Sequence, residues 1–501
     1  MSARLKFPVA AAALLLAAAL LLAACAVGPD FERPAAPTVS GYTPESLTPE
    51  TAAADIAGGA AQHFAAGQDI PGEWWTLFHS EPLNTLIAES LQANPDLQAA
   101  QAALRQAQEL VYAQEGVFFP SVDASFQQQR QKINGAASGE PNLHGIFNLS
   151  TAAVSVSYPL DVFGGERRQL ESTEAQAEYQ RFQLEAAYLT LTSNVVAAAV
   201  QESSLRAQIA ATQDIINDQS QQVDVLRQQF TLGGVAKSAV LADETVLAQT
   251  RATLPPLQKQ LAQQRNRIAA LAGHFPSEAP SQTFELAALQ LPQDLPVSLP
   301  SQLVEQRPDV RAAEAQLHQA SAQIGVATAN MLPQFTITGD IGSTALAIGS
   351  LFTPGTGVWS IAGAIAQPIF HGGTLLHEKR AAEAAYDEAA GQYRSTVLAA
   401  FQNVADSLRA LQADADALKA SLAAEQAAAD SLNLARDQFK LGAISYPALL
   451  DSQTAYQQTR IALVQAQSNR YADTAALFQA LGGGWWNRTD VAAEAGARKN
   501  N

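Results

Sequence analysis

The two halves of this 501-residue chain repeat one sequence pattern. The segment NPDLQAAQAALRQAQELVYAQEGVFFPSVDASF, which starts at Asn94, is similar to RPDVRAAEAQLHQASAQIGVATANMLPQFTITG, which starts at Arg307. Prolines and glycines recur in the same order in both copies. The matched positions are Pro95 with Pro308, Pro120 with Pro333, Phe230 with Phe439, Gly233 with Gly442 and Leu271 with Leu481, at offsets of 209 to 213 residues. Chance similarity between alanine-rich helices would not align these residues, so the chain is predicted to hold two copies of one structural unit.

Each copy is predicted to contain a helix, two strands, a long helix and a returning helix. Proline suits the first helical position, so the first helix begins at Pro95 or Pro308, and Asn94 can cap it in the first copy. In the segments that follow, apolar residues alternate with small or polar ones, which is typical of strands with one apolar face. The apolar positions are Val122, Ala124 and Phe126; Ala152, Val154, Val156, Tyr158 and Leu160; Phe335, Ile337 and Ile341; and Trp359, Ile361 and Ile365. This alternation fits a transmembrane β-barrel and equally a half-buried sheet of a soluble protein.

The predicted helix lengths favour a membrane protein over a soluble one. Helical stretches of some 65 residues run from the glycine pairs at 164–165 and 372–373 to about 229 and 438, and a helix of that length spans roughly 100 Å. The shorter helices of the first copy, at about 95–118 and 235–272, together match one long helix. The chain can then return to the level where it began if the strands lie at one end of the helices and the glycine turn at the other. The remaining segments would form a belt between the two ends. We expect Pro255-Pro256 to interrupt the returning helix and bend it near that belt.

Four strands are too few to close a barrel in a membrane. Known membrane barrels have at least about eight strands, and open sheet edges are not tolerated in lipid. The protein is therefore predicted to oligomerise, with 8, 12 or 16 strands from two, three or four copies.

The N-terminus indicates export and a lipid anchor. Arg4 and Lys6 precede a 16-residue apolar run that is too short to span a bilayer comfortably and has the layout of an export signal. Small residues then precede Cys25, which resembles the lipobox of bacterial lipoproteins. Cys25 is the only cysteine in the chain, so it has no disulfide partner, and we expect it to become the acylated first residue of the mature protein. Several acyl chains on one residue anchor firmly, whereas one binds only marginally.

The charge of the chain excludes one class of partner. The sequence holds 30 Lys and Arg against 47 Asp and Glu, and removal of the leader changes the net charge from −17 to −19. Nucleic acid is therefore not expected as a partner. No apolar stretch after the leader reaches the length of a membrane-spanning helix.

Four segments resemble a known family. They are CAVGPDFERP, WWTLFHSEPLNTLIAESLQANPDL, LPSQLVEQRPDVRAAEAQLHQASAQIGVATANMLPQFTITG and DQFKLGAISYPALLDSQTAYQQTRIALVQAQSNRY. They are similar to the outer membrane factors of tripartite export, in the NodT-type lipoprotein branch that serves resistance-nodulation-division (RND) efflux pumps. The resemblance implies a mainly α, TolC-like homotrimer with a 12-stranded β-barrel in the outer membrane, a periplasmic α-helical barrel and a mixed equatorial domain. It also implies a periplasmic membrane-fusion adaptor and an inner-membrane RND pump as partners, with small molecules such as drugs as cargo.

The resemblance and the repeat together predict a domain plan. Its parts are a signal peptide at 1–24, a lipidated N-terminal and equatorial segment at 25–93, a first repeat at 94–273, an equatorial linker at 274–306, a second repeat at 307–483 and a tail at 484–501.

A gate is expected at the helix turn farthest from the barrel, since side chains of three subunits can meet on the axis there. Asp451 matches the position where the family carries an aspartate on its pore axis, and three neighbouring carboxylates would repel one another and attract cations. Pro447 and Thr454 depart from the family, which often has an apolar constricting residue and sometimes a basic partner at these positions. We expect Tyr446 to lie beside Asp451. Asp243, in the first copy, would form a second acidic ring.

The sequence gives no support to catalysis, a cofactor or a bound metal. The seven histidines are scattered, and GGVAKS at Gly233 lacks the spacing of a phosphate-binding loop. Two other classes stay open: a lipid-anchored spacer of coiled helices without a channel, and a monomeric periplasmic binding lipoprotein. Conductance in planar bilayers separates the first from a channel, and oligomeric state separates the second.

Overall fold

A computed structural model describes residues 26–45, 47–134 and 144–489. The chain forms two compact units. The first takes in the chain up to Pro34 with Ala103–Arg181 and Ala312–Arg394, and the second takes in Ala35–Ala102, Phe182–Arg311 and the chain from Ser395. The expected signal peptide and Cys25 lie outside the described residues, as does most of the expected C-terminal tail.

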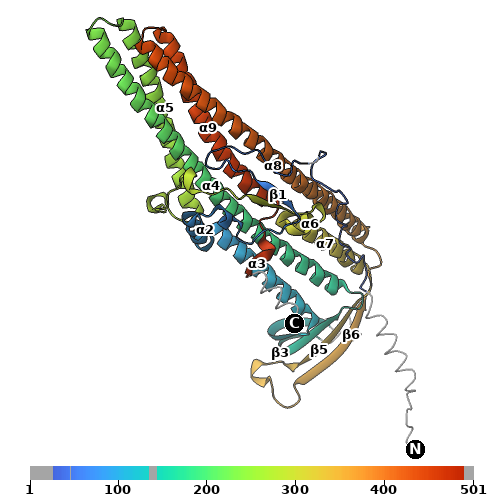
Figure 1. Cartoon of the computed structure of the whole chain (residues 1–501). Helices are drawn as coiled ribbons and strands as arrows, with labels where there is room; N and C mark the ends of the chain where they lie inside the picture. Colours follow the sequence, from blue (N-terminus) through green and yellow to red (C-terminus); the bar gives the residue numbers. More distant parts are fainter. Residues whose placement is uncertain (1–25, 46, 135–143, 490–501) are drawn as a thin grey trace, which may run out of the picture. The chain divides into compact units, whose positions relative to one another are not determined.

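The first unit contains a four-stranded antiparallel sheet. Its strands are β2 (Ser121–Asn134), β3 (His144–Leu160), β5 (Gln334–Ala345) and β6 (Gly357–Ala366), in the order β2-β3-β5-β6. Figure 1 shows the labelled strands β3, β5 and β6 side by side. The two strands of one repeat thus pair with the two strands of the other through β3 and β5.

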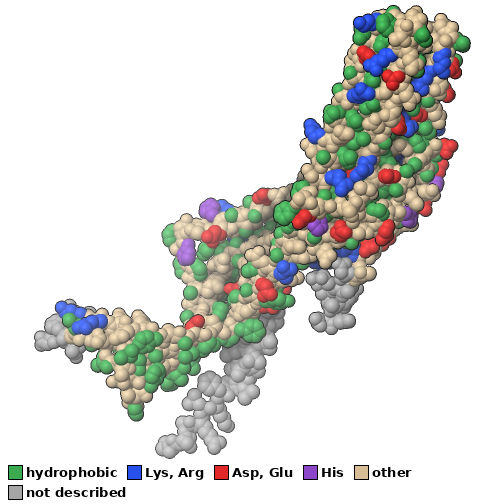
Figure 2. Space-filling model, turned by 90° about the vertical axis from the view of Figure 1, so that its left-hand side faces the viewer, with side chains coloured by type: hydrophobic (Ala, Val, Ile, Leu, Met, Phe, Trp, Pro, Cys, Tyr) green, Lys and Arg blue, Asp and Glu red, His purple; other side chains and the backbone are tan. Residues whose placement is uncertain are grey.

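The strand register places the alternating apolar residues on one face of this sheet. Val122 lies opposite Val156, and Val154 lies between Ala124 and Ile341. The same row continues from Ile341 to Trp359. Trp359, Ile361 and Ile365 are each at least 69% exposed, and Figure 2 shows hydrophobic side chains gathered over the sheet. The predicted apolar face is confirmed, and its exposure is that of a surface that faces lipid rather than a core.

Long helices follow the strands in both repeats. They are α4 (Gly165–Thr231) and α8 (Thr374–Lys440), each of 67 residues, and the returning helices are α5 (Lys237–Leu271) and α9 (Tyr446–Ala480), each of 35 residues. The helices before the strands are α3 (Pro95–Glu115) and α7 (Pro308–Ala329). Asn94 caps α3 as predicted, because its Oδ1 accepts hydrogen bonds from the amides of Asp96 (3.0 Å) and Leu97 (3.1 Å). Within the described ranges, the helices lack the combination of length and apolar character needed to cross a membrane.

The expectation that Pro255-Pro256 would interrupt the returning helix was wrong. Both prolines lie inside α5, which continues through them. Proline removes its own amide donor, so two bonds of the helical ladder are lost while the bonds on either side persist.

The repeat is visible in how the helices end. Gly234 donates its amide to the carbonyl of Gln229 and Gly233 donates to that of Phe230, a pairing characteristic of a Schellman cap. The same pattern closes α8 at Gly442, α5 at Gly273 and α9 at Gly482. All four glycines at the first position of the cap have positive φ, between 69° and 94°. Glycine is therefore needed at these turns because it adopts this conformation without a steric penalty.

The second unit also has a small mixed region. Strand β1 (His63–Ala66) pairs in parallel with β4 (Asp294–Val297), and the same unit contains the helices α2 (Glu81–Ala93) and α6 (Pro300–Gln306). Trp74 is buried here and stacks on Phe478 of α9, with ring centroids 5.2 Å apart. Among the described residues, the short 3-10 helices are η1 (Trp74–Phe78), η2 (Gly116–Phe118), η4 (Pro276–Glu278), η5 (Leu286–Ala288), η6 (Ile348–Ser350) and η7 (Trp485–Asn487).

Candidate functional site

The sheet has a polar face opposite its apolar one. Asp340 of β5 accepts hydrogen bonds from the hydroxyls of Ser155 on β3 (2.6 Å) and Ser360 on β6 (3.1 Å). Asp123 of β2 lies opposite Ser155 in the strand register, so the row Asp123, Ser155, Asp340, Ser360 crosses all four strands on one face. A sheet with lipid-facing residues on one side and carboxylates and hydroxyls on the other can form the wall of a water-filled pore.

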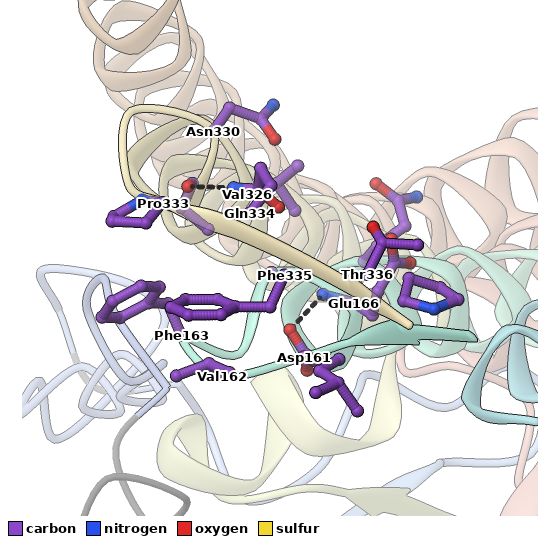
Figure 3. A pocket seen from close by; sticks show the side chains of 15 residues that line it. Asp161, Val162, Phe163, Glu166, Val326, Asn330, Pro333, Gln334, Phe335 and Thr336 are labelled. Atoms are coloured by element: carbon purple, nitrogen blue, oxygen red, sulfur yellow. Dashed lines mark hydrogen bonds between the residues drawn. The ribbon is translucent and has the colours of Figure 1, made fainter. Parts of the chain in front are cut away.

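Where the strands pass into the helices, the first unit contains a cavity of about 170 Å³ (Figure 3). Asp161, just after β3, accepts hydrogen bonds from the amides of Glu166 and Arg167, both at 3.0 Å. These bonds satisfy two of the free amides in the first turn of α4. On the other side of the cavity, Gln334 at the start of β5 donates to the carbonyl of Ala329 at the end of α7 (3.0 Å).

At the far ends of the long helices, each repeat forms a hairpin. Figure 1 shows α4 beside α5 and α8 beside α9. Buried Ile216 and Val223 of α4 pack against Leu247 of α5. In the second hairpin, Leu432 and Ala435 of α8 pack against Leu449 of α9, surrounded by Phe439, Ile444, Tyr446 and Tyr456. An exposed ion pair joins the two hairpins, from Arg436 of α8 to Asp218 of α4 at 3.1 Å.

Asp243 and Tyr446, two of the predicted gate residues, lie together between these hairpins. The side chain of Asp243 on α5 is fully buried, and its carboxylate oxygens have no partner at hydrogen-bond geometry in the described part of the chain. Burial raises the pKa of Asp243, although the nearby hydroxyl of Tyr446 partly opposes this. Burial, followed by the Asp243 carboxyl, raises the pKa of the Tyr446 phenol. Within a single chain Asp243 is thus an interhelical contact and not a side chain exposed toward a pore.

Asp451 and Pro447 are placed differently. Pro447 occupies the first turn of α9, where its missing amide leaves no bond unmade, and it is exposed. Asp451 is also exposed, and it makes no hydrogen bond or ion pair within the ranges that the structure describes. The hydroxyl of Thr454 binds the carbonyl of Leu450 in its own helix. Asp451 is therefore free to meet its copies in an oligomer.

Sequence reasoning missed a buried charged cluster in the second unit. Arg470 of α9 is fully buried and donates through Nη2 to the Oε1 of Gln62 (2.8 Å) and to the carbonyl of Ala60 (3.1 Å). Burial lowers the pKa of Arg470. Burial, and then the neighbouring carboxyl of Asp473, raise the pKa of Asp414 on α8 to about 7. Periodicity in a helix gives no signal for the Arg470 hydrogen bonds, which join residues 408 and 410 positions apart in the chain.

The chain matches known proteins over almost all of its length. The profile of the family described as outer membrane efflux protein matches residues 86–274 and 299–483, once for each repeat. The probable efflux pump outer membrane protein TtgC of Pseudomonas putida is 29% identical over 474 residues, which cover 93% of this chain and 94% of TtgC. The probable outer membrane lipoprotein SilC of Salmonella typhimurium is 28% identical over 468 residues, or 92% of this chain and 95% of SilC.

The fold is also that of a solved channel. The structure of the outer-membrane channel OprN superposes with a TM-score of 0.82 at 27% identity and covers 92% of this chain and all of that one. These matches favour a channel over a spacer without a pore. With a lipid-facing sheet, an opposite polar face and long paired helices, the chain belongs to the outer membrane efflux protein family and is an outer-membrane efflux channel of TolC-like fold.

Proposed function

We propose that this chain is the passive exit duct of a tripartite efflux pump and works as a homotrimer. The observation that carries this proposal is the four-stranded sheet, in which β2 and β6 each have only one neighbour among the described strands. Unpaired backbone groups at a sheet edge are too costly in lipid, so both edges must pair with other copies. Three copies give 12 strands, the number that the family resemblance implies.

The duct acts without catalysis in this proposal. Its partners are a periplasmic membrane-fusion adaptor, which docks at the helix tips, and an RND-type pump in the inner membrane, which selects the cargo. Support comes from the family and from relatives whose names describe efflux pump components. A pore lined by hydroxyls and carboxylates needs no covalent chemistry to conduct small molecules.

The gate is assigned to the helix tips. Asp243 and Tyr446 hold the hairpin of the first repeat against that of the second within one chain. Asp451 contributes one carboxylate from each subunit to a ring on the axis, with Pro447 beside it at the start of α9. Support comes from the burial of Asp243 and of the Tyr446 hydroxyl, and from the exposure of Asp451.

The lipid anchor is assigned to Cys25. The lipobox-like sequence supports this, as does the similarity to SilC, which is named a lipoprotein. Two anchors in one membrane, the acyl chains and the barrel, would act together.

Two measurements test the duct. Purified protein should run as a trimer that dissociates on heating, and it should conduct ions in planar bilayers. A monomer without conductance would contradict the proposal.

The anchor has its own test. Cys25→Ser should lose acylation, measured as the mass of the N-terminal peptide, yet still form trimers that insert through their barrel. Complete loss of barrel assembly with normal export would show that the acyl chains, and not the sheet, hold the protein in the membrane.

A further inference from the structure

The first residues after Cys25 are docked on the helices of the first unit. The amide of Val27 donates to the carbonyl of Phe163, just after β3, at 3.0 Å. Ala26 lies against Gly164, so closely that a Cβ on Gly164 would come within 2.6 Å of the Ala26 Cα. Ala26 and Val27 therefore contact the turn that leads from β3 into α4.

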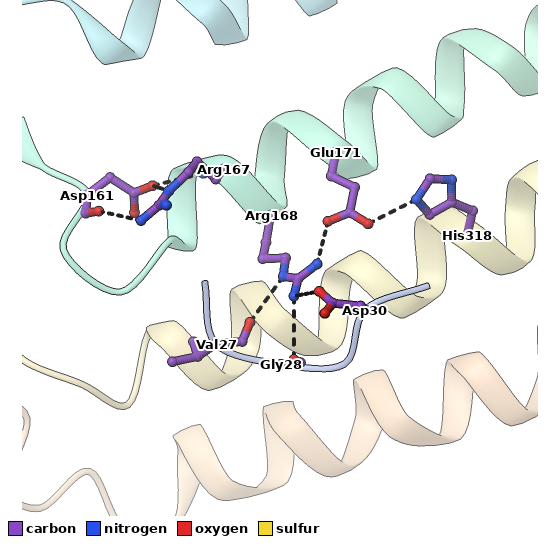
Figure 4. A network of polar contacts seen from close by, with 8 residues as sticks. All are labelled: Val27, Gly28, Asp30, Asp161, Arg167, Arg168, Glu171 and His318. Atoms are coloured by element: carbon purple, nitrogen blue, oxygen red, sulfur yellow. Dashed lines mark hydrogen bonds and ion pairs between the residues drawn. The ribbon is translucent and has the colours of Figure 1, made fainter. Parts of the chain in front are cut away.

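Arg168 of α4 binds this segment through several groups (Figure 4). Its side chain is 6% exposed. Nε donates to the carbonyl of Val27 at 3.1 Å and Nη2 pairs with the carboxylate of Asp30 at 2.6 Å. Nη1 pairs with Glu171 at 2.7 Å, which holds the guanidinium in place. A planar group with five donors suits such simultaneous binding of carbonyls and carboxylates.

Two glycines make room for the contact. A Cβ on Gly325 of α7 would lie 2.6 Å from the Arg168 Cγ and 2.9 Å from the Val27 carbonyl oxygen. A Cβ on Gly28, whose φ is +97°, would lie 2.4 Å from the Gly325 Cα. Side chains at either position would push the segment off α7.

Further contacts continue along α7. The ring of Phe31 stacks on His318, with centroids 4.3 Å apart, and His318 bonds Glu171 at 2.9 Å. Arg33 pairs with Glu314 at 2.9 Å. The segment 26–33 is thus held from end to end.

The repeat shows that this docking site belongs to one copy only. Helices α4 and α8 are equally long, so Arg168 corresponds to His377. The proline offset of 213 pairs Gly325 with Tyr112. Tyr112 and His377 are both exposed. A feature required by the shared fold would appear in both copies, so this one serves the segment that only one copy receives.

We propose that Arg168 and Gly325 form a docking site that fixes residue 25, and with it the lipid, at the helix-proximal end of the membrane sheet. If the eight residues 26–33 were not docked, the segment could extend by up to about 28 Å and the lipid could move over that distance. When the segment is docked, the acylated residue is only one position, or about 3.8 Å between Cα atoms, from Ala26. Arg168 is a positioning residue here. The consequence for the lipid rests on the proposed acylation of Cys25, but the docking itself does not.

Spin-label mobility tests the docking. A nitroxide on Pro29→Cys, an exposed position within the segment, should give a slow, single-component spectrum in the trimer. Arg168→Met should convert most of that spectrum to a fast component, and Gly28→Ala should do the same. Gly28→Ala changes a residue of the docked segment itself and leaves the sequences of α4, α7 and the sheet unchanged. If Arg168→Met does not assemble, Gly28→Ala therefore still tests whether the segment is docked.

Matched controls come from the chain itself. His377→Met alters the residue that corresponds to Arg168, and Gly41→Ala alters a glycine eight residues after the segment in the sequence, whose Cβ would meet only the carbonyl oxygen of Thr43, at 3.9 Å. Both should leave the slow spectrum intact. A second label on Leu232→Cys, at the distant turn between α4 and α5, should be unaffected by every variant, which separates undocking from general loosening.

An immobile label in both Arg168→Met and Gly28→Ala would overturn the proposal, since the segment would then be held elsewhere. Repeating the series with Cys25→Ser separates the two claims. If the slow spectrum persists there, docking is independent of acylation, while the mass of the N-terminal peptide tests acylation alone.

Discussion

The fully buried carboxyl group of Asp243 lies between two helical hairpins. Burial disfavours the charged form of a carboxyl group, so the pKa of Asp243 is raised from 3.8. The folded tip then binds a proton more tightly than the unfolded chain does. Between 3.8 and the raised pKa the folded state holds more protons, so the stability that buried Asp243 gives to the folded tip falls as pH rises through that window.

This linkage predicts a pH-dependent tip. In single-channel recordings, the fraction of time spent open should increase as the pH on the tip side is raised from 3.8 through the raised pKa of Asp243. Asp243→Asn keeps the shape and cannot ionise, so its open fraction should stay constant. Asp437→Asn, at an exposed site near the end of α8, serves as the control and should behave as wild type. The same pH response in wild type and Asp243→Asn would remove Asp243 from the gate.

Asp451 should act on ions and not on packing. Three exposed carboxylates that approach one another on an axis repel, and a polyvalent cation between them relieves that repulsion. Asp451→Ala should therefore weaken block by trivalent cations added on the tip side and reduce the preference for cations. Asp243→Ala should change block less, because that carboxyl is buried within its own chain. Equal block in wild type and Asp451→Ala would exclude the proposed ring.

At the scale of elements, the two faces of β6 offer a direct comparison. Ile361 and Ala362 are neighbours on one strand, and their side chains point to opposite faces of the sheet. Ile361→Lys places a charge on the lipid face, at a cost of about 2–4 kcal/mol near the bilayer centre. Ala362→Lys places the same charge on the polar face and should be tolerated. The fraction of heat-dissociable trimer in outer membranes measures both, and equal yields would mean that the faces are misassigned.

Periodicity predicted the elements well because each depends on local sequence. The period of two predicted the apolar face of the strands, and the matched glycines predicted the turns between the helices. Asn94 was predicted to cap α3, and it does. Pro255 misled because neighbouring helical bonds outweigh the two that the prolines remove. Docking of Val27 on Arg168 could not be predicted, since it joins residues 141 positions apart through a carbonyl that any amino acid supplies.

The gate itself stays a prediction, and only the positions of its candidate residues can be compared with the structure. The positions of Asp243 and Tyr446 at the helix tips follow from the turn glycines and from the resemblance. The contact between Asp243 and the hydroxyl of Tyr446 depends on how two hairpins pack, and a sequence pattern within either hairpin contains no information on that contact.

On the scale of the whole molecule, closure of the sheet decides whether the chain makes a pore. Each chain supplies two free edges, β2 and β6, and one polar face on which Asp123 and Asp340 stand in a single row. If β6 of one copy pairs with β2 of the next, the apolar faces form a continuous outer wall. The carboxylates then line the bore, which predicts a preference for cations over anions.

Cysteine cross-linking tests that closure. With Ser360→Cys on β6 fixed, a second cysteine is moved through the polar-face positions of β2, which are the odd-numbered residues from 121 to 131. Residues directly opposite on paired strands have Cα atoms about 4.5–5.5 Å apart, which a disulfide spans. One of the β2 positions should therefore give a reducible covalent trimer on denaturing gels. Ser155→Cys with Asp340→Cys, a directly opposed pair within one chain, is the control and should oxidise without changing the size of the chain. If that control pair oxidises and every β2 position yields only monomer, then β6 does not pair with β2 of another copy, and the sheet must be closed in some other way.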